Sequence, residues 1–173
     1  MATEIERKFL LADETWRAAV AHAEEMAQGY LAGPPQARCS VRVRIAGDAA
    51  FLNIKSLGGV ERDEYDYAIP PDDARHMLET LAGNVVEKRR HHVRVDGWLF
   101  EIDEFAGANA GLVVAEIELP AVDAAFPHPH WLGREVSGLA RYYNLNLALR
   151  PYAAWTDAER RADDAPVQGV PTC

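Results

Sequence analysis

The sequence of 173 residues contains very little cysteine: Cys39 and Cys173 stand far apart, and no CxxC pair occurs. Disulfide-stapled domains and thiolate metal sites both need closely spaced cysteines, so neither is expected. Long apolar runs are also absent, as is an N-terminal basic segment followed by an apolar stretch. We therefore expect neither a membrane span nor a secretory leader, and a cytoplasmic location is the default.

Positive charge is scarce as well. The chain has 18 Lys and Arg residues against 27 Asp and Glu residues, which gives a formal net charge of −9. Nucleic-acid-binding domains normally carry a basic surface, so no nucleic-acid partner is expected. Hydrophobic residues make up 49% of the chain, which is typical of a folded globular protein.

Two familiar site motifs are missing. No GxxxxGK[ST] phosphate-binding loop occurs. Histidines stand at His91-His92 and at His128 and His130, but no further ligands accompany them at zinc-site spacing. We therefore expect no zinc site, although His92 would be a pH-sensitive phosphate contact if it faces the same side as the basic residues before it.

What the sequence does have is alternation of charged and apolar residues in several segments. SVRVRIAG, FLNIKS and ERDEYDYAI each place polar side chains on one face of a strand and mostly apolar ones on the other. VVEKRRHHVRV and LFEIDEF form a hairpin pattern that turns at Asp96-Gly97, and LVVAEIELP follows after a GANAG turn. This pattern is typical of an antiparallel sheet.

Helical patterns surround these segments. DETWRAAVAHAEEM predicts a helix over about residues 13–26, and PPDDARHMLETLAG predicts one with a proline start and a glycine stop. WLGREVSGLARYYNLNLALR predicts helical structure in the C-terminal third. The expected organisation is one domain over residues 1–150, followed by a weakly ordered tail over residues 151–173.

The charges on the strand faces come in blocks of one sign. EIE occurs twice, whereas RVR and KRRHHVR are basic. Two like charges about 6 Å apart repel by roughly 3 kcal/mol at an effective dielectric of 20. Any single pair is more often a solvated strand face. Together, the blocks favour a closed sheet with its charged face inward, where carboxylates suit divalent cations and basic side chains suit phosphate.

The order of these motifs resembles the CYTH family, also called triphosphate tunnel metalloenzymes. EIERKFL is similar to the family's N-terminal ExExK signature, and RVRI, NIKS, RDEYDYAI, EKRR, FEIDEF, AEIELP and RYYN follow in order over roughly residues 2–150. The resemblance implies an α+β fold, in which an eight-stranded antiparallel β-barrel forms a tunnel and helices pack outside. The charged strand faces would line that tunnel.

The resemblance also implies roles for individual residues. The residues implied to bind the triphosphate are Lys8, Arg42, Arg44, Lys55, Lys88, Arg90 and Arg141. Those implied to bind Mg²⁺ or Mn²⁺ are Glu4, Glu6, Asp103, Glu116 and Glu118, with Glu64 as a further candidate. The candidate catalytic residues are Glu6, Lys8, Tyr30 and Glu64. The chain departs from the family at Leu139, where members commonly carry an aspartate that would orient Arg141.

Among family members, the short bacterial inorganic tripolyphosphatases resemble this chain most. The implied reaction is metal-dependent hydrolysis of tripolyphosphate to pyrophosphate and phosphate, in which Glu6 or a neighbouring carboxylate orients the attacking water. Three alternatives stay open: a nucleoside or thiamine triphosphatase, a class IV adenylate cyclase, and a non-catalytic polyphosphate-binding module. The expected partner is a small-molecule triphosphate, without membrane or nucleic acid, and the resemblance suggests a homodimer.

Overall fold

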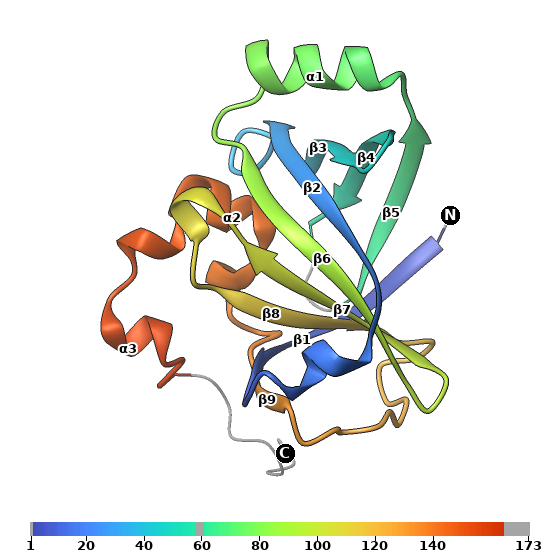
Figure 1. Ribbon diagram of the computed structural model, residues 1–173. Coiled ribbons are helices and arrows are strands. Elements are labelled where there is room, and N and C mark those ends of the chain that lie inside the picture. The colour runs from blue at the N-terminus through green and yellow to red at the C-terminus, as the bar shows by residue number, and fades with distance from the viewer. Residues whose placement is uncertain (1, 58–60, 165–173) are drawn as a thin grey trace.

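The computed structural model describes residues 2–57 and 61–164, and of residues 2–4, 61 and 62 it describes the backbone alone (Figure 1). The strands are β1 (Ala2–Leu11), β2 (Val20–Ala32), β3 (Cys39–Ala46), β4 (Ala49–Ser56), β5 (Glu61–Ala68), β6 (Val86–Val95), β7 (Trp98–Phe105), β8 (Val113–Glu118) and β9 (Leu132–Glu135). The α-helices are α1 (Pro71–Thr80), α2 (Asn144–Leu149) and α3 (Asp157–Arg160). Short 3₁₀ helices are η1 (Thr15–Ala19), η2 (Gly107–Asn109), η3 (Ala140–Tyr142) and η4 (Tyr152–Ala154). Within these ranges, no helix has the length and apolar character needed to span a membrane.

The strands form one antiparallel sheet in the order β5-β4-β3-β2-β6-β7-β8-β1-β9. The first half of β1 also pairs with β5, from Ala2 opposite Glu64 to Ile5 opposite Glu61, and this pairing closes β1 to β8 into a ring. The predicted eight-stranded antiparallel barrel is therefore confirmed. The short strand β9 adds to the second half of β1, in a region where the sequence predicted helical structure.

The prediction of a helix over residues 13–26 is wrong. Thr15–Ala19 form a single 3₁₀ turn, and the chain then continues as the long strand β2. This strand is hydrogen-bonded to β3 on one side and to β6 on the other, and it buries Met26 and Gln28. The ladder to β6 over residues 20–28, the ladder to β3 over residues 26–32 and this burial together outweigh the helical preference of an alanine-rich segment.

Both turns predicted in the second half of the sheet are confirmed. Asp96 and Gly97 join β6 to β7 with positive φ angles of 49° and 85°, as a two-residue type I′ hairpin requires. The GANAG stretch forms η2 and the turn into β8, where Gly107 and Gly111 also have positive φ angles of 58° and 91°. These glycines therefore set the register between neighbouring strands that carry charged residues.

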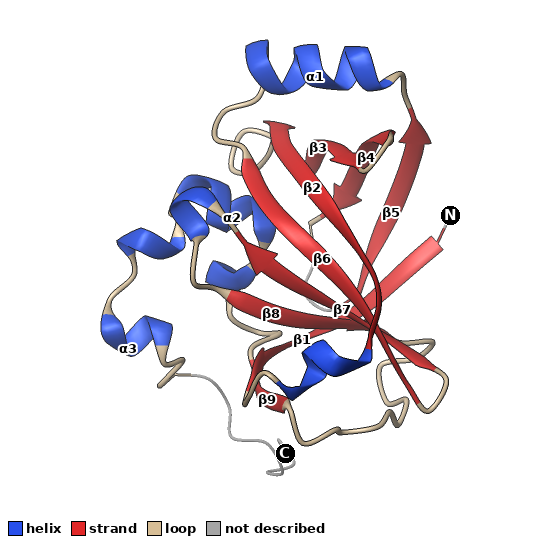
Figure 2. Ribbon diagram, viewed as in Figure 1, coloured by secondary structure: helices blue, strands red, loops and turns tan. Residues whose placement is uncertain are grey.

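The helices pack outside the barrel (Figure 2). α1 forms where it was predicted and covers β3 and β4, where Ala74 packs with Val43 and Ala50 in a buried cluster. The chain just after α1 comes very close to β2, because a Cβ atom on Gly29 would lie 2.6 Å from the Cβ of Ala82. A larger residue than glycine would push this segment away from the barrel wall.

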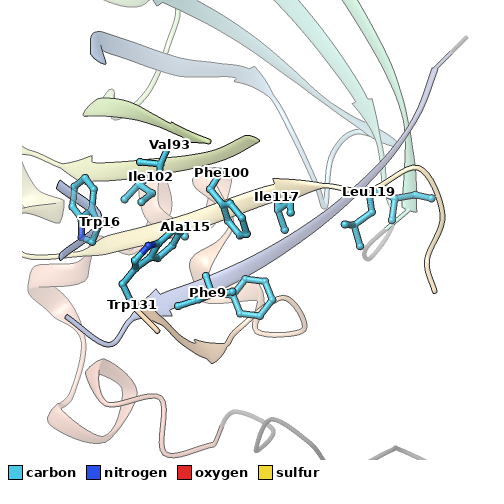
Figure 3. Packing of buried hydrophobic residues seen from close by; sticks show 11 residues of the cluster. Phe9, Trp16, Val93, Phe100, Ile102, Ala115, Ile117, Leu119 and Trp131 are labelled. Atoms are coloured by element: carbon cyan, nitrogen blue, oxygen red, sulfur yellow. The ribbon is translucent and has the colours of Figure 1, made fainter. Parts of the chain in front are cut away.

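The largest apolar cluster covers the outer faces of β1, β6, β7 and β8 (Figure 3). Phe9, Phe100 and Ile102 are fully buried there. Trp131, from the loop before β9, meets Phe100 edge-on with ring centroids 5.2 Å apart. The apolar side of these strands is thus used for the core, which leaves the other side for the charged residues.

A second apolar cluster joins the C-terminal segment to one end of the barrel. Its strand members stand two residues from charged residues of the inner face: Val86 from Lys88, Phe105 from Asp103 and Val114 from Glu116. They share the cluster with Tyr142, Leu147 and Trp155. The chain just beyond Pro151 is therefore packed on the barrel. Residues from 165 onward lie outside the described range. The predicted division of the chain into a domain and a tail at residue 150 stays a prediction.

Candidate functional site

The inner faces of the strands surround a cavity of about 760 Å³. Residues two positions apart on one strand point to the same face. The charged residues that alternate along the inner face of one strand therefore meet those of the neighbouring strands in this cavity. The predicted site residues that line it are Glu6, Lys8, Tyr30, Arg42, Arg44, Lys55, Glu64, Lys88, Arg90, Glu116 and Glu118. Its volume is in the range of pockets that hold small-molecule ligands.

Arginines without strong partners form one part of the wall. Arg42 is buried, and among the described residues its Nη1 donates a single long hydrogen bond, 3.5 Å to Gln28 Oε1. Arg44 contacts Asp66, 3.3 Å from Nη2 to Oδ2. Among the described atoms, the buried Nε of each arginine has no hydrogen-bond partner. Burial and the neighbouring Arg42 charge lower the pKa of Arg44, so both guanidinium groups would gain from an anion in the cavity.

The strands β4 and β5 add an amide and carboxylates to this wall. Lys55 Nζ lies 3.3 Å from Glu64 Oε1. Asn53 is 1% exposed, donates to Glu64, and donates to Asp66 over 3.1 Å. Sequence reasoning missed Asn53 and Asp66 as site residues, although the alternation in FLNIKS and RDEYDYAI had placed both on the charged face.

Carboxylates dominate the wall formed by β1 and β8. The register places Glu6 opposite Glu118 and Lys8 opposite Glu116. Lys8 Nζ donates to both Glu6 and Glu116. Although burial favours the neutral amine, Glu116 and Glu6 raise the pKa of Lys8 above its ordinary value. Burial likewise opposes ionisation of Glu116, but Lys8, Arg90 and Lys88 hold its pKa well below the usual range.

Arg90 and Lys88 connect the acidic wall to β6 and β7. Arg90 donates to Asp103 through Nε and Nη2, each over 2.7 Å, to Glu116 over 2.6 Å, and to Glu101. Lys88 donates to Asp103 as well. Burial and the charge of Arg90 lower the pKa of Lys88 to about 8. Glu101 lines the cavity and is a further residue that the prediction missed.

Two of the predicted site residues, Asp103 and Arg141, do not line the cavity. The side chain of Glu4 lies outside the described part of the structure. Asp103 is fully buried behind Lys88 and Arg90. Arg141 instead donates to Asp164 Oδ2 over 2.6 Å and lies over the Trp155 ring, 5.5 Å from its centroid. Leu139 packs against the second apolar cluster, so the carboxylate partner of Arg141 comes from the C-terminal segment.

None of the described residues that line the cavity is a histidine. His92 shares a strand face with Lys88 and Arg90, as its position in β6 requires. It is not among the residues that line the cavity. Its Nε2 lies 3.6 Å from Glu24 Oε1 and 3.9 Å from Glu101 Oε1, and its ring meets that of His22 edge-on.

The oxygen donors around Lys8 suit a hard divalent cation. Glu6, Glu116 and Glu118 all line the cavity, and Mg²⁺ and Mn²⁺ prefer carboxylate and water ligands. In the described part of the chain, no three His, Cys, Asp or Glu side chains already converge to form a metal site. This agrees with the hydrogen bonds that turn Glu6 and Glu116 toward Lys8. The donor set thus fits such an ion by its chemistry, with side-chain rotation required.

The sequence matches the CYTH domain over residues 2–152. It is 42% identical to an inorganic triphosphatase of Acetivibrio thermocellus over 154 residues, 88% of this chain and 97% of that protein. An inorganic triphosphatase of Nitrosomonas europaea is 41% identical over 150 residues, 85% of this chain and 97% of that protein. A crystal structure of an inorganic triphosphatase superposes with a TM-score of 0.65 at 38% identity, over 86% of this chain and 96% of that one. The chain, with its closed barrel and its cavity of charged side chains, therefore belongs to the CYTH domain family.

Proposed function

We propose that this protein hydrolyses inorganic triphosphate to pyrophosphate and phosphate. One observation carries the proposal: the closed barrel brings basic and acidic strand faces together in a single cavity. A linear triphosphate carries negative charge along its whole length, so it needs cationic groups on more than one wall. Relatives named inorganic triphosphatases, at 42% and 41% identity, support this choice of substrate.

We further propose that the reaction depends on Mg²⁺ or Mn²⁺. Glu6, Glu116 and Glu118 would hold the ion, together with Glu4 from the same strand. When bound, it would neutralise charge on phosphoryl oxygens and make a water more acidic. Glu6 and Glu118 stand directly opposite each other on β1 and β8, and such like-charged pairs are unfavourable unless cations lie close by.

The protein's own side chains would position the substrate. Arg42 and Arg44 would donate to phosphoryl oxygens, because their buried Nε atoms have no partner among the described residues. Tyr30 stands opposite Arg42 across β2 and β3 and would contact the same phosphoryl group. Lys8 would neutralise the negative charge nearest to the carboxylates. Phosphoryl transfer depends mainly on such positioning and charge neutralisation.

The attacking water would be oriented by a carboxylate. Glu6 is the leading candidate because it lines the cavity beside Lys8. Glu64, on β5, which pairs with the first half of β1, also lines the cavity and is the alternative. A Glu6→Gln protein that keeps its Mn²⁺ affinity and turns over at nearly the normal rate would remove Glu6 from this role.

A substrate panel tests the proposed function. Tripolyphosphate, ATP, thiamine triphosphate and pyrophosphate are each incubated with the full-length protein and Mg²⁺ or Mn²⁺, and phosphate release is measured. The proposal predicts release from tripolyphosphate well above that from the other three. Faster turnover of ATP or thiamine triphosphate, cyclic AMP formed from ATP, or tight binding without any product would each contradict it and point to one of the three alternatives.

Two further expectations stay predictions. The protein is expected to be cytoplasmic, and it is expected to form a homodimer. Fractionation of cells that express the protein would determine its location. Light scattering coupled to size exclusion would determine its oligomeric state.

A further inference from the structure

Asp103 is the most deeply buried carboxylate among the described residues of the site. It is 0% exposed, and it does not line the cavity. Both of its oxygens are occupied: Oδ1 accepts from Arg90 Nε over 2.7 Å, and Oδ2 accepts from Arg90 Nη2 over 2.7 Å and from Lys88. Arg90 and Lys88, in contrast, both reach the cavity surface. Asp103 therefore lies one layer behind the wall that a substrate would touch.

This arrangement is poorly suited to metal binding. Mg²⁺ in proteins keeps several water ligands and a regular octahedral geometry. A carboxylate that is 0% exposed and does not line the cavity offers no space for those waters. Glu116 differs, because it lines the cavity and is 7% exposed. The metal role implied for Asp103 by the family resemblance does not fit its surroundings.

The same arrangement suits an anchor. A bidentate carboxylate fixes the plane of a guanidinium group, and here it also holds an ammonium beside it. Arg90 stands directly opposite Asp103 in the register of β6 and β7. Among the described residues, Arg90 also donates to Glu101 and Glu116, so without Asp103 the guanidinium would turn toward those two carboxylates.

We propose that Asp103 is a positioning residue, which fixes Lys88 and Arg90 toward the cavity and does not bind the metal. The inference rests on the proposed triphosphate site. It assigns the buried pair of Asp103 with Arg90 to the support of the substrate-binding cations, and it leaves Glu6, Glu116 and Glu118 as the carboxylates available to an ion.

Binding of Mn²⁺ alone, measured by calorimetry on the full-length protein, separates an anchor from a ligand. Asp103→Asn keeps the Kd for Mn²⁺ within about threefold of the wild type, whereas Glu116→Gln weakens it by about tenfold or more. An Asp103→Asn protein that loses as much Mn²⁺ affinity as Glu116→Gln overturns the proposal.

Binding of tripolyphosphate without metal separates positioning from a purely structural role. Removal of a negative charge by itself would strengthen anion binding, and loss of a structural contact alone would leave it unchanged. Positioning predicts the opposite sign, a Kd raised about tenfold in Asp103→Asn. Glu104→Gln is the matched control, because Glu104 is the next residue of β7, faces outward and pairs with Arg17. Its Kd stays at the wild-type value, and an Asp103→Asn Kd that is unchanged or lower refutes the proposal.

A second variant keeps the test valid if Asp103→Asn does not fold. Asp103→Leu combined with Lys88→Met removes one charge of each sign from the buried cluster, a replacement that proteins often tolerate. This double variant binds Mn²⁺ within about threefold of the wild type if Asp103 is an anchor, and a tenfold loss overturns the proposal. These binding measurements do not depend on turnover, so a wild-type protein that binds tripolyphosphate without hydrolysing it refutes the proposed function and leaves the test of Asp103 in force.

Discussion

Arg44 offers a sharp test, because its replacement should weaken substrate binding and stabilise the fold at the same time. In Arg44→Met, a guanidinium group of the cavity wall is replaced by an uncharged side chain of similar length. The positive charge is unfavourable where it lies, since burial and Arg42 lower the pKa of Arg44. The partner nearest to it, Asp66, lies 3.3 Å away and is itself exposed.

The structure gives the expected magnitudes. Arg42 and Arg44 are two residues apart on one strand face, about 6.6 Å along the chain, which corresponds to a repulsion of about 2.5 kcal/mol at an effective dielectric of 20. The contact with Asp66 offsets about 1 kcal/mol of this. Arg44→Met should therefore gain about 1.5 kcal/mol of stability and raise the unfolding temperature by about 3–6 °C. Loss of one charge-assisted hydrogen bond to phosphate, about 1.5–3 kcal/mol, raises the Kd for tripolyphosphate by about 10- to 100-fold.

Thermal unfolding by circular dichroism and calorimetric titration with tripolyphosphate measure the two effects. Arg89→Met is the matched control, because Arg89 lies on the opposite face of β6, beside the site residue Arg90, and contacts Glu25 at 3.6 Å. It should change stability by less than about 0.5 kcal/mol and leave the Kd unaltered. An Arg44→Met protein that unfolds several degrees earlier and binds tripolyphosphate like the wild type would refute the reasoning.

Four further predictions follow from the same structure. Because the pKa of Lys88 is lowered to about 8, the Kd for tripolyphosphate should rise as the pH increases through that value, and titrations of Lys88→Met should lack this change. Hydrogen bonds from Arg7 lower the pKa of Glu135 despite its burial. The ionised form of Glu135 therefore stabilises the fold above the ordinary pKa of 4.5, and this contribution is lost at lower pH. In denaturant titrations, Glu135→Gln should lose less stability than the wild type between about pH 5 and pH 3. Trp155 is 5% exposed and meets Tyr142 edge-on with centroids 4.9 Å apart, so Trp155→Ala should cost about 3–5 kcal/mol and lower the unfolding temperature by about 10 °C. Removal of divalent ions by a chelator should abolish phosphate release and re-addition of Mn²⁺ should restore it; activity that persists after exhaustive chelation would contradict the proposed metal dependence.

Local alternation explains most of what could be predicted about the barrel. The period of two in SVRVRIAG or LVVAEIELP determines which side chains share a face, and the Asp-Gly turn determines how β6 pairs with β7. β2 was not predicted, because its alanines and glutamates favour a helix and its extended conformation depends on pairing with its two neighbouring strands. β9 escaped because its four residues depend on pairing with β1, far away in the sequence.

The sequence could predict a site residue where its strand face and its charge were enough to place it in the cavity. Depth along the strand was not predictable, so Asp103 and Glu116 were given the same role although one lies behind the cavity wall and the other forms part of it. The side chain of Arg141 is oriented by its hydrogen bond to Asp164. The two residues lie in separate segments, and no sequence motif links them. Asn53 carries no charge, so a search for charged residues passed over it.

The central claim is that the charged faces of the strands form one internal site for a triphosphate. A crystal structure of the full-length protein with tripolyphosphate and Mn²⁺ tests it most directly. We expect phosphoryl oxygens within hydrogen-bond distance of Arg42 and Arg44, and the ion on Glu6, Glu116 or Glu118. Tripolyphosphate bound on the outer surface, with the cavity holding only water, would contradict it.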